Sequence, residues 1–268
     1  MPFWFRVTGK SLLAPALLAL GGLPGNSNAC ENGTAIISGG TTNPPLTWRS
    51  QNKLVGADVE FMQTVLAEVG IKAIADEGGP WKRVLRRAEL GQVDIVMGFR
   101  KSANSEKVLN FLDPPITPAV QSVFYHVNRS FDYSSWSDLI GRSGSMTLGS
   151  NFDTEFEDYL KSNLTVQYVP KIEQNFSKLD KGRVDYMLGP LMSTKLYIQK
   201  YGYSDRIVAA SKPLMTIQEH IAIAKNSSCG KYADHIEKRI SEYIMTDKFN
   251  DLIENYFVKW IQEEPQNK

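Results

Sequence analysis

The chain has 268 residues, of which 42% are hydrophobic and 22% charged, and these ordinary globular proportions exclude a wholly disordered protein. Its formal charge of +1 provides no electrostatic footprint for nucleic acid or for an anionic membrane. Two cysteines and three histidines cannot form a four-ligand zinc site without heavy use of carboxylates, so we expect neither a metal nor a cofactor.

The first 29 residues have the pattern of a secretory signal peptide. A basic segment with Arg6 and Lys10 precedes an apolar run that is short for a membrane span. Small residues at Ser27 and Ala29 predict cleavage before Cys30. A lipoprotein anchored through Cys30 is the less favoured alternative, because Ser27 stands where a lipobox has leucine. We therefore predict a periplasmic protein.

Cys30 and Cys229 are the two cysteines of the chain. In the oxidising compartment that follows export, an even pair favours a disulfide bond. The bond would tie the beginning of the mature chain to a segment near its end. Two free thiols are the alternative.

Helical and strand patterns alternate along the chain, which predicts an α/β fold. One apolar helical face covers residues 61–69 and a second covers residues 81–88, and a glycine follows each. A short apolar strand comes next, at residues 93–97. Two amphipathic helices are predicted near the end of the chain, at residues 232–243 and 249–260.

One ten-residue pattern occurs twice, at residues 89–98 and 180–189. Each copy begins with an acidic residue, continues through glycine and Val-Asp, and ends with a short apolar run and a second glycine. The pattern predicts a helix that ends at a glycine, followed at once by a buried strand. Because ligands of open α/β sheets bind at the carboxyl ends of strands, the two copies favour two similar lobes that face one cleft. A chance match is the alternative, and we expect Asp94 and Asp185 to orient backbone groups.

Two strand-like segments, at residues 121–127 and 217–224, enclose a block of about ninety residues. The block is interpreted as an inserted second lobe at 128–212, and the first lobe then comprises 31–125 plus 217–262. Two crossing segments form a hinge, and a hinge beside a cleft indicates closure on a ligand.

Eight short motifs follow one another along the chain. The first lobe contains Asn43-Pro-Pro-Leu-Thr-Trp48, Leu54-Val-Gly-Ala-Asp-Val-Glu-Phe61, Pro80-Trp81, Gly91-Gln-Val-Asp94 and Phe111-Leu-Asp-Pro114. The second contains Asp138-Leu-Ile-Gly141, Thr147-Leu-Gly-Ser150 and Gly182-Arg-Val-Asp185. In this order they resemble the periplasmic solute-binding proteins of family 3, the polar-amino-acid type. The resemblance implies the type II periplasmic binding protein fold, with two mixed sheets flanked by helices and a two-segment hinge.

The resemblance also implies a function. The lobes would close on a small polar solute and deliver it to an ABC transporter permease. A membrane receptor that senses the closed form is the alternative partner, and we expect a monomer. A dehydratase-like enzyme on the same fold, with Glu77 or Asp153 as acid or base, is the less favoured function. It would be indicated by a carboxyl group that is buried in the cleft with a raised pKa and no cation partner.

Two charge anchors of the family are replaced in this sequence. Ser105 stands where the family has an arginine for the ligand carboxylate, and Pro190 stands where it has an aspartate for the amino group. Asn43 stands where an aromatic residue often stacks on the ligand. Since a buried charge without a partner is costly, the resemblance implies a solute that need not be a standard amino acid.

Other candidates are placed along the cleft by their position in the chain. Arg100 follows a strand end that faces the cleft, and we expect it to bind an acidic group. Trp48 and Trp81 would form apolar walls, with a place in the core as the alternative. The acidic candidates for an amine are Asp76, Glu77 and Asp153. The cleft would also include Asn43, Gly98, Phe99, Ser105, Ser150, Asn151 and Gly189, of which Ser150 or Asn151 could instead cap a helix.

Overall fold

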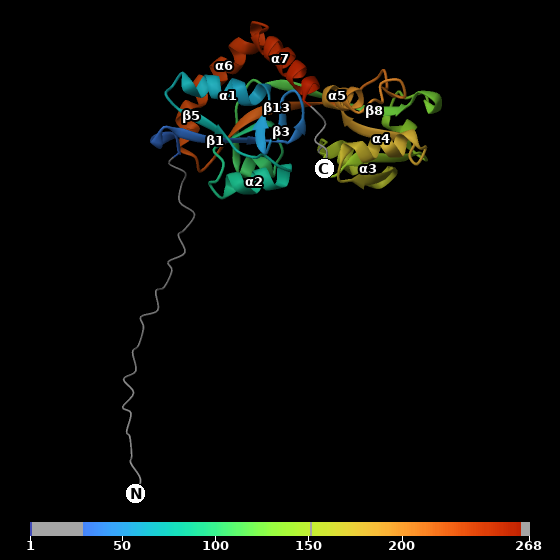
Figure 1. The fold of residues 1–268 in the computed structure, drawn as a ribbon, viewed down its shortest axis with the longest axis horizontal. Helices are drawn as coiled ribbons and strands as arrows, with labels where there is room; N and C mark the ends of the chain where they lie inside the picture. Colours follow the sequence, from blue (N-terminus) through green and yellow to red (C-terminus); the bar gives the residue numbers. More distant parts are fainter. Residues whose placement is uncertain (2–28, 151, 264–268) are drawn as a thin grey trace.

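The computed structural model describes Met1 and residues 29–150 and 152–263. The predicted signal peptide lies almost wholly outside these described residues. Figure 1 shows two groups of helices and strands side by side, which we call the first and second lobes. Two long strands connect them, β8 (Thr117–His126) and β13 (Met215–Ala224). These strands cover the predicted crossing segments at residues 121–126 and 217–224, and residue 127 already belongs to the turn that follows β8.

Each lobe alternates strands with helices, as the sequence predicts. The strands of the first lobe are β1 (Thr34–Gly39), β2 (Thr42–Asn43), β3 (Thr47–Ser50), β4 (Lys53–Val55), β5 (Lys72–Ala75), β6 (Ile95–Arg100) and β7 (Leu109–Phe111). Its helices are α1 (Ala57–Ala67), α2 (Trp81–Glu89), α6 (Ala233–Met245) and α7 (Lys248–Gln262). The second lobe contains β9 (Ser143–Thr147), α3 (Thr154–Asn163), β10 (Thr165–Val169), α4 (Ile172–Asp180), β11 (Tyr186–Pro190), α5 (Leu191–Lys200) and β12 (Ile207–Ala209). Short 3₁₀ turns lie at η1 (Ala29–Asn32), η2 (Ser105–Lys107), η3 (Val127–Arg129), η4 (Trp136–Leu139) and η5 (Ser228–Tyr232).

The strands of both lobes share one hydrogen-bonded path, in the order β10-β9-β11-β8-β13-β6-β1-β5. β8 and β13 pair antiparallel, from Met215 opposite Gln121 to Glu219 opposite Thr117. The predicted two-lobed α/β architecture is confirmed, and this pairing joins its two mixed sheets into one continuous sheet. A separate small sheet, β2-β3-β4, belongs to the first lobe.

The repeated ten-residue pattern forms the same unit in each lobe. α2 is followed by Gly91, whose φ is +70°, and then by β6. α4 is followed by Gly182, whose φ is +65°, and then by β11. At both places the chain needs a left-handed turn to end the helix, which glycine adopts without steric cost.

The aspartate of each repeat fixes the neighbouring strand. Asp94 Oδ2 accepts the backbone N–H of Ile36 at 2.8 Å, and Asp185 Oδ2 accepts that of Ser143 at 2.7 Å. Ile36 directly precedes the pairing of β1 with β6, which starts at Ile37, and Ser143 directly precedes that of β9 with β11, which starts at Gly144. The prediction that these aspartates orient backbone groups is confirmed.

An aromatic cluster connects the two lobes beside the main sheet. Trp260 at the end of α7 packs edge-on against Trp48 of β3, with 5.6 Å between ring centroids, and against Tyr197 of α5, with 5.0 Å. Lys200 Nζ lies 3.8 Å from the centre of a Trp260 ring and donates to the Trp260 carbonyl at 3.0 Å. Since α7 and β3 belong to the first lobe and α5 to the second, burial of Trp260 holds the lobes together.

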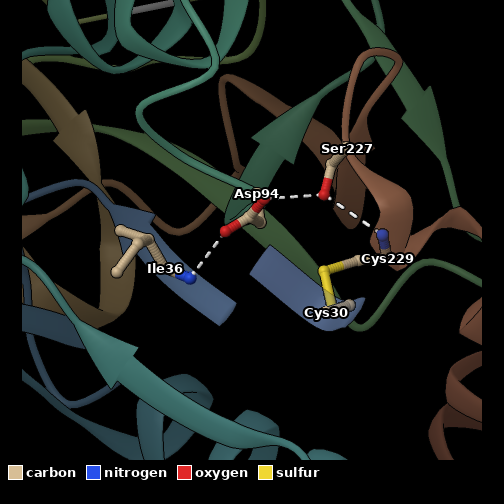
Figure 2. The surroundings of a disulfide bond; sticks show 5 residues. All are labelled: Cys30, Ile36, Asp94, Ser227 and Cys229. Atoms are coloured by element: carbon tan, nitrogen blue, oxygen red, sulfur yellow. Dashed lines mark hydrogen bonds between the residues drawn. A yellow bond between two sulfur atoms is a disulfide. The ribbon is translucent and has the colours of Figure 1, made fainter. Parts of the chain in front are cut away.

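The predicted disulfide bond joins Cys30 of η1 to Cys229 of η5 (Figure 2), with 5.1 Å between the Cα atoms. Beside it, Ser227 Oγ accepts the N–H of Cys229 at 3.2 Å and donates to Asp94 Oδ1 at 2.7 Å. The same aspartate therefore orders the loop that carries Cys229 and the start of β1.

The disulfide closes a long loop, because its cysteines are 199 residues apart. We expect the variant with both Cys30→Ser and Cys229→Ser to lose up to about 5 kcal/mol in free energy of unfolding, since the unfolded chain regains the entropy of that loop. Urea titration of the two proteins measures the difference. Wild type with reductant is the control, and equal midpoints for variant and oxidised wild type would contradict the expectation.

Candidate ligand-binding site

A cavity of about 660 Å³ lies between the lobes. Trp81 and Gly98 line it from the first lobe, Ser150 and Gly189 line it from the second, and Gln121 of β8 lies on its wall. The size is within the range of small-molecule sites, about 300 to 1,000 Å³. Because both lobes contribute walls, a solute bound there would touch both at once.

The structure brings most of the predicted site residues together at this cavity. Those on its wall are Asn43, Trp48, Trp81, Gly98, Phe99, Arg100, Ser150 and Gly189. Glu77 and Ser105 do not lie on its wall. Asn151 lies outside the described residues. That these residues bind a ligand remains a prediction.

Trp48 takes both of the roles considered for it. It lies on the cavity wall, but it is only 2% exposed and packs edge-on against Tyr256 and Trp260. Its indole N–H donates to Glu263 Oε2 at 3.1 Å. Trp81 is less buried and packs edge-on against Phe99, with 4.8 Å between ring centroids. Trp81 is therefore the more accessible of the two aromatic walls.

Ser105 is part of the loop that follows β6. It is 1% exposed, and its Oγ donates to the carbonyls of Arg100 at 3.3 Å and of Ser102 at 3.1 Å. Ser105 stands where the resemblance implies a ligand-binding arginine. Its hydroxyl instead supports the backbone of Arg100.

Three acidic residues were considered as partners for an amine of the ligand, and each either has another partner or lies away from the cavity. Asp76 pairs with Arg87 at 2.5 Å. Glu77 is exposed. Asp153 is the N-cap of α3 and accepts the N–H of Phe156 at 2.8 Å. None of the three lies on the cavity wall.

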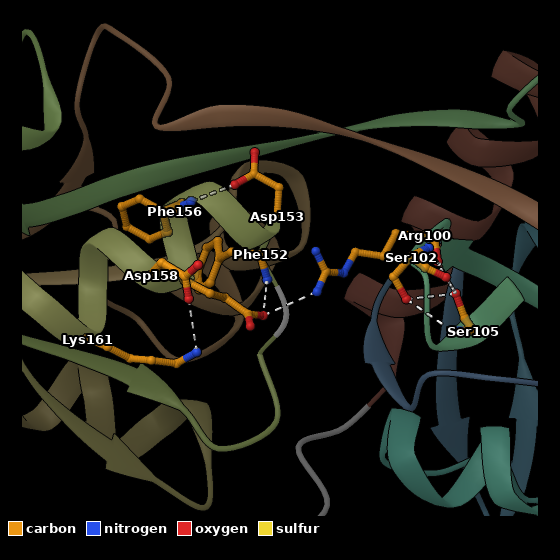
Figure 3. A network of polar contacts seen from close by, with 9 residues as sticks. Arg100, Ser102, Ser105, Phe152, Asp153, Phe156, Asp158 and Lys161 are labelled. Carbon is orange, nitrogen blue, oxygen red and sulfur yellow. Dashed lines mark hydrogen bonds and ion pairs between the residues drawn. The ribbon is translucent and has the colours of Figure 1, made fainter. Parts of the chain in front are cut away.

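Arg100 reaches from the first lobe to the second (Figure 3). Its Nη2 lies 3.2 Å from Glu157 Oε1 on α3, and the same oxygen accepts the N–H of Phe152 at 3.4 Å. Burial lowers the pKa of Arg100, while Glu157 and Asp153 act in the opposite direction. Arg100 Nε is buried with no hydrogen-bond partner among the described residues. The guanidinium can therefore bind an anionic group that enters the cavity or displaces Glu157.

Two buried carboxyl groups beside the cavity were not among the predicted site residues. Asp58, in the first turn of α1, is 1% exposed, and Glu219 of β13 is half-buried and lines the cavity, with its Oε2 atom buried. Burial raises the pKa of Asp58 to about 7. Burial, together with the charge of Asp58, raises the pKa of Glu219 to about 8. One signal was available in the sequence, because Glu219 is an acidic residue in a predicted crossing strand.

Comparison with known proteins gives the same fold and a consistent set of relatives. The family described as bacterial extracellular solute-binding proteins, family 3, matches residues 36–133. The probable amino-acid-binding protein YxeM of Bacillus subtilis is 24% identical over 265 residues, 96% of each chain. The L-cystine-binding protein TcyJ of Escherichia coli is 22% identical over 202 residues, 74% of this chain and 73% of that protein. A crystal structure of the amino acid ABC transporter substrate-binding protein AbpA from Streptococcus pneumoniae, bound to L-arginine, has a TM-score of 0.72 at 19% identity and covers 88% of this chain and 99% of its own.

The predicted resemblance to family 3 is confirmed. The type II periplasmic binding protein fold is confirmed as well, by the structural likeness. The region that matches the family includes β6 and Arg100, so part of the first-lobe wall of the cavity lies within it.

Glu219 meets the criterion that would indicate a dehydratase-like enzyme, although Glu77 and Asp153 do not lie in the cavity. The curated relatives reported above are named as binding proteins, which agrees with the expectation that the chain is not an enzyme. We therefore relate the buried carboxyl groups to binding. Within the described residues, no group of three or more His, Cys, Asp or Glu side chains could hold a metal ion, and no helix has the length and apolar character needed to cross a membrane.

The raised pKa values of Asp58 and Glu219 make stability depend on pH. In the unfolded chain these carboxyl groups release their protons near their ordinary pKa values of 3.8 and 4.5. The folded chain holds the same protons until about pH 7 and pH 8. The folded state therefore binds more protons in between, and we expect its free energy of unfolding to fall as the pH rises from about 4 to 8. Urea titration across this range measures the slope.

Glu219→Gln should flatten that slope, because the variant has one fewer carboxyl group that must ionise in a buried place. Glu77→Gln is the matched control, since it makes the same substitution at an exposed position outside the cavity. Identical slopes for Glu219→Gln and wild type would show that Glu219 does not titrate in this range.

Proposed function

We propose that this protein is a secreted solute-binding protein that captures a small polar solute in the cavity between its lobes and delivers it to an ABC transporter. The observation that carries the proposal is the cavity itself, whose walls come from both lobes. The relatives named as amino-acid-binding and L-cystine-binding proteins support the same role.

Closure of the lobes is the proposed mechanism. The lobes comprise residues 31–125 plus 217–262 and residues 128–212, and β8 and β13 act as the hinge between them. A solute on one lobe meets the second wall only when the lobes approach, so it stabilises the closed state by those added contacts.

The solute need not be a standard amino acid. Pro190 lies on the cavity wall at the end of β11 and offers neither a charge nor an N–H to a ligand. The Ser105 hydroxyl donates to carbonyls of its own loop. Arg100 remains to bind an acidic group, because it lies on the cavity wall and its Nε has no partner among the described residues.

The periplasm is the proposed location. A signal peptide over residues 1–29 would direct export, and an oxidising compartment suits the bond between Cys30 and Cys229. A lipid anchor at Cys30 would need the thiol that this disulfide uses, so the bond supports the unanchored form. A monomer remains part of the proposal.

A thermal-shift screen of the mature protein against a broad metabolite library tests the proposed function. A solute at a hundred times its dissociation constant adds about 2.7 kcal/mol of stability, so we expect one chemical class to raise the melting temperature clearly. Small-angle scattering with that solute should then show a smaller radius of gyration. A tight solute that produced no compaction would contradict closure, and a library without any stabilising solute would contradict the binding role.

Arg100→Ala tests the proposed anchor for an acidic group. We expect at least tenfold weaker binding of an acidic solute from the screen, about 1.4 kcal/mol or more, because a charge-assisted hydrogen bond is lost. Isothermal titration calorimetry measures the affinity. Arg83→Ala, at an exposed arginine of α2, is the matched control. Equal affinities in both variants would exclude Arg100 from the site.

A further inference from the structure

Two carboxyl groups converge on Gly98 from different elements. Gly98 is near the end of β6, has a φ of +67° and lines the cavity. A Cβ atom placed on it would lie 3.5 Å from Asp58 Oδ2 and 3.7 Å from Glu219 Oε2. The carboxyl groups of α1 and β13 thus border one small space beside the cavity.

Asp58 is buried and Glu219 is half-buried, and each has a buried carboxyl oxygen without a partner among the described residues. Asp58 Oδ1 and Glu219 Oε2 have no hydrogen-bond partner among the described residues, and neither residue forms an ion pair there. Thr117, opposite Glu219 in the pairing of β8 with β13, also has a buried hydroxyl without a partner in the described part of the chain. Polar groups are thus concentrated here without being satisfied within the chain.

The cation opposite Glu219 on the neighbouring strand is directed elsewhere. Arg100 of β6 pairs in register with Glu219, but its Nη2 is bonded to Glu157 of the second lobe. Arg100 therefore pairs with Glu157 across the cleft. The charge of Glu219 is left without a cation partner among the described residues.

Other charged groups on the adjoining elements also have partners of their own. His220, next to Glu219 on β13, has its Nδ1 at 2.9 Å from the carbonyl of Leu112 and at 3.5 Å from Asp113 Oδ1. On α1, Glu60 lies 3.7 Å from Lys259 of α7. These contacts supply no positive charge to the space beside Gly98.

Two ionised carboxylates in such a space would be costly, because each loses hydration and the two repel each other. The cost falls if the pair holds protons or if a cation enters. Glu219 lies on the cavity wall, so a cation can arrive from the side where a solute would bind.

We propose that Asp58 and Glu219 form a subsite for a cationic amine of the bound solute, and that the pair releases a proton when the amine binds. This inference rests on the proposed solute-binding function and specifies which part of the cavity recognises a positive charge. It assigns the amine to residues other than Asp76, Glu77 and Asp153, which are paired, exposed or used as a helix cap.

The test uses the mature protein and a simple diamine, 1,4-diaminobutane, with neutral 1,4-butanediol of similar shape as its counterpart. At about pH 8.5 and up to about 50 mM, we expect the diamine to raise the melting temperature of wild type and the diol to leave it unchanged. Potassium chloride at equal ionic strength controls for salt and for an inorganic cation. No shift with the diamine, or an equal shift with the diol or the salt, would overturn the subsite.

Glu219→Gln provides the residue-level test, with Asp58→Asn as a second variant. We expect the apparent dissociation constant of the diamine to rise at least tenfold in each variant and to stay unchanged in the Glu77→Gln control. Equal stabilisation of Glu219→Gln and wild type would overturn the assignment. The metabolite screen separates this failure from that of the proposed function, because a solute that binds wild type and Glu219→Gln equally well supports the function and rejects the subsite.

Proton release gives a readout that a purely structural role would not change. Calorimetric titration near pH 7 in two buffers of different ionisation enthalpy should show protons released by wild type on binding the diamine, and fewer released by Glu219→Gln, in which only Asp58 can still lose one. We also expect binding to wild type to be at least tenfold weaker at pH 6 than at pH 8.5, because the protons must leave before the amine is bound. Binding that is independent of pH would contradict the coupling.

Discussion

The antiparallel pairing of β8 with β13 is the constraint on which the rest of the structure depends. These two strands join the sheet of the first lobe to that of the second, and they also border the cavity. In the proposed closure, the two lobes would rotate about these strands while the ladder between them is kept. The same ladder places Glu219 opposite Thr117 and beside β6, so it builds part of the proposed binding site as well.

The charges of the cavity are arranged on both sides of this ladder. Arg100 extends across the cleft to Glu157, so the bond between them must break or be exchanged when the lobes separate or an anion enters. Asp58 and Glu219 stay within the first lobe and its crossing strand, without a cation from the described chain. Arg100 on the cavity wall is thus already paired, whereas the acidic pair beside the cavity has no cation partner among the described residues, and this asymmetry differs from the charge anchors that the family resemblance implies.

Local patterns predicted much of this fold. The apolar faces of α1 and α2 and the glycines after α2 and α4 could be predicted because helix periodicity and left-handed turns depend on nearby residues. The disulfide bond between Cys30 and Cys229 could be predicted because they are the two cysteines of the chain and an exported protein meets an oxidising compartment. The acidic pair could not be found in this way, because Asp58 and Glu219 are far apart in the chain and meet only through the packing of α1 against the sheet. The contact from Arg100 to Glu157 depends likewise on how the lobes approach.

The position of Trp260 has a consequence for temperature. Its ring is buried between Trp48 of the first lobe and Tyr197 of the second, so separation of the lobes there would expose aromatic surface to water. The free energy gained by burying apolar surface decreases on cooling. The contribution of this contact to the closed arrangement is therefore smaller in the cold, and the lobes are expected to separate more readily at low temperature than at the temperature of growth.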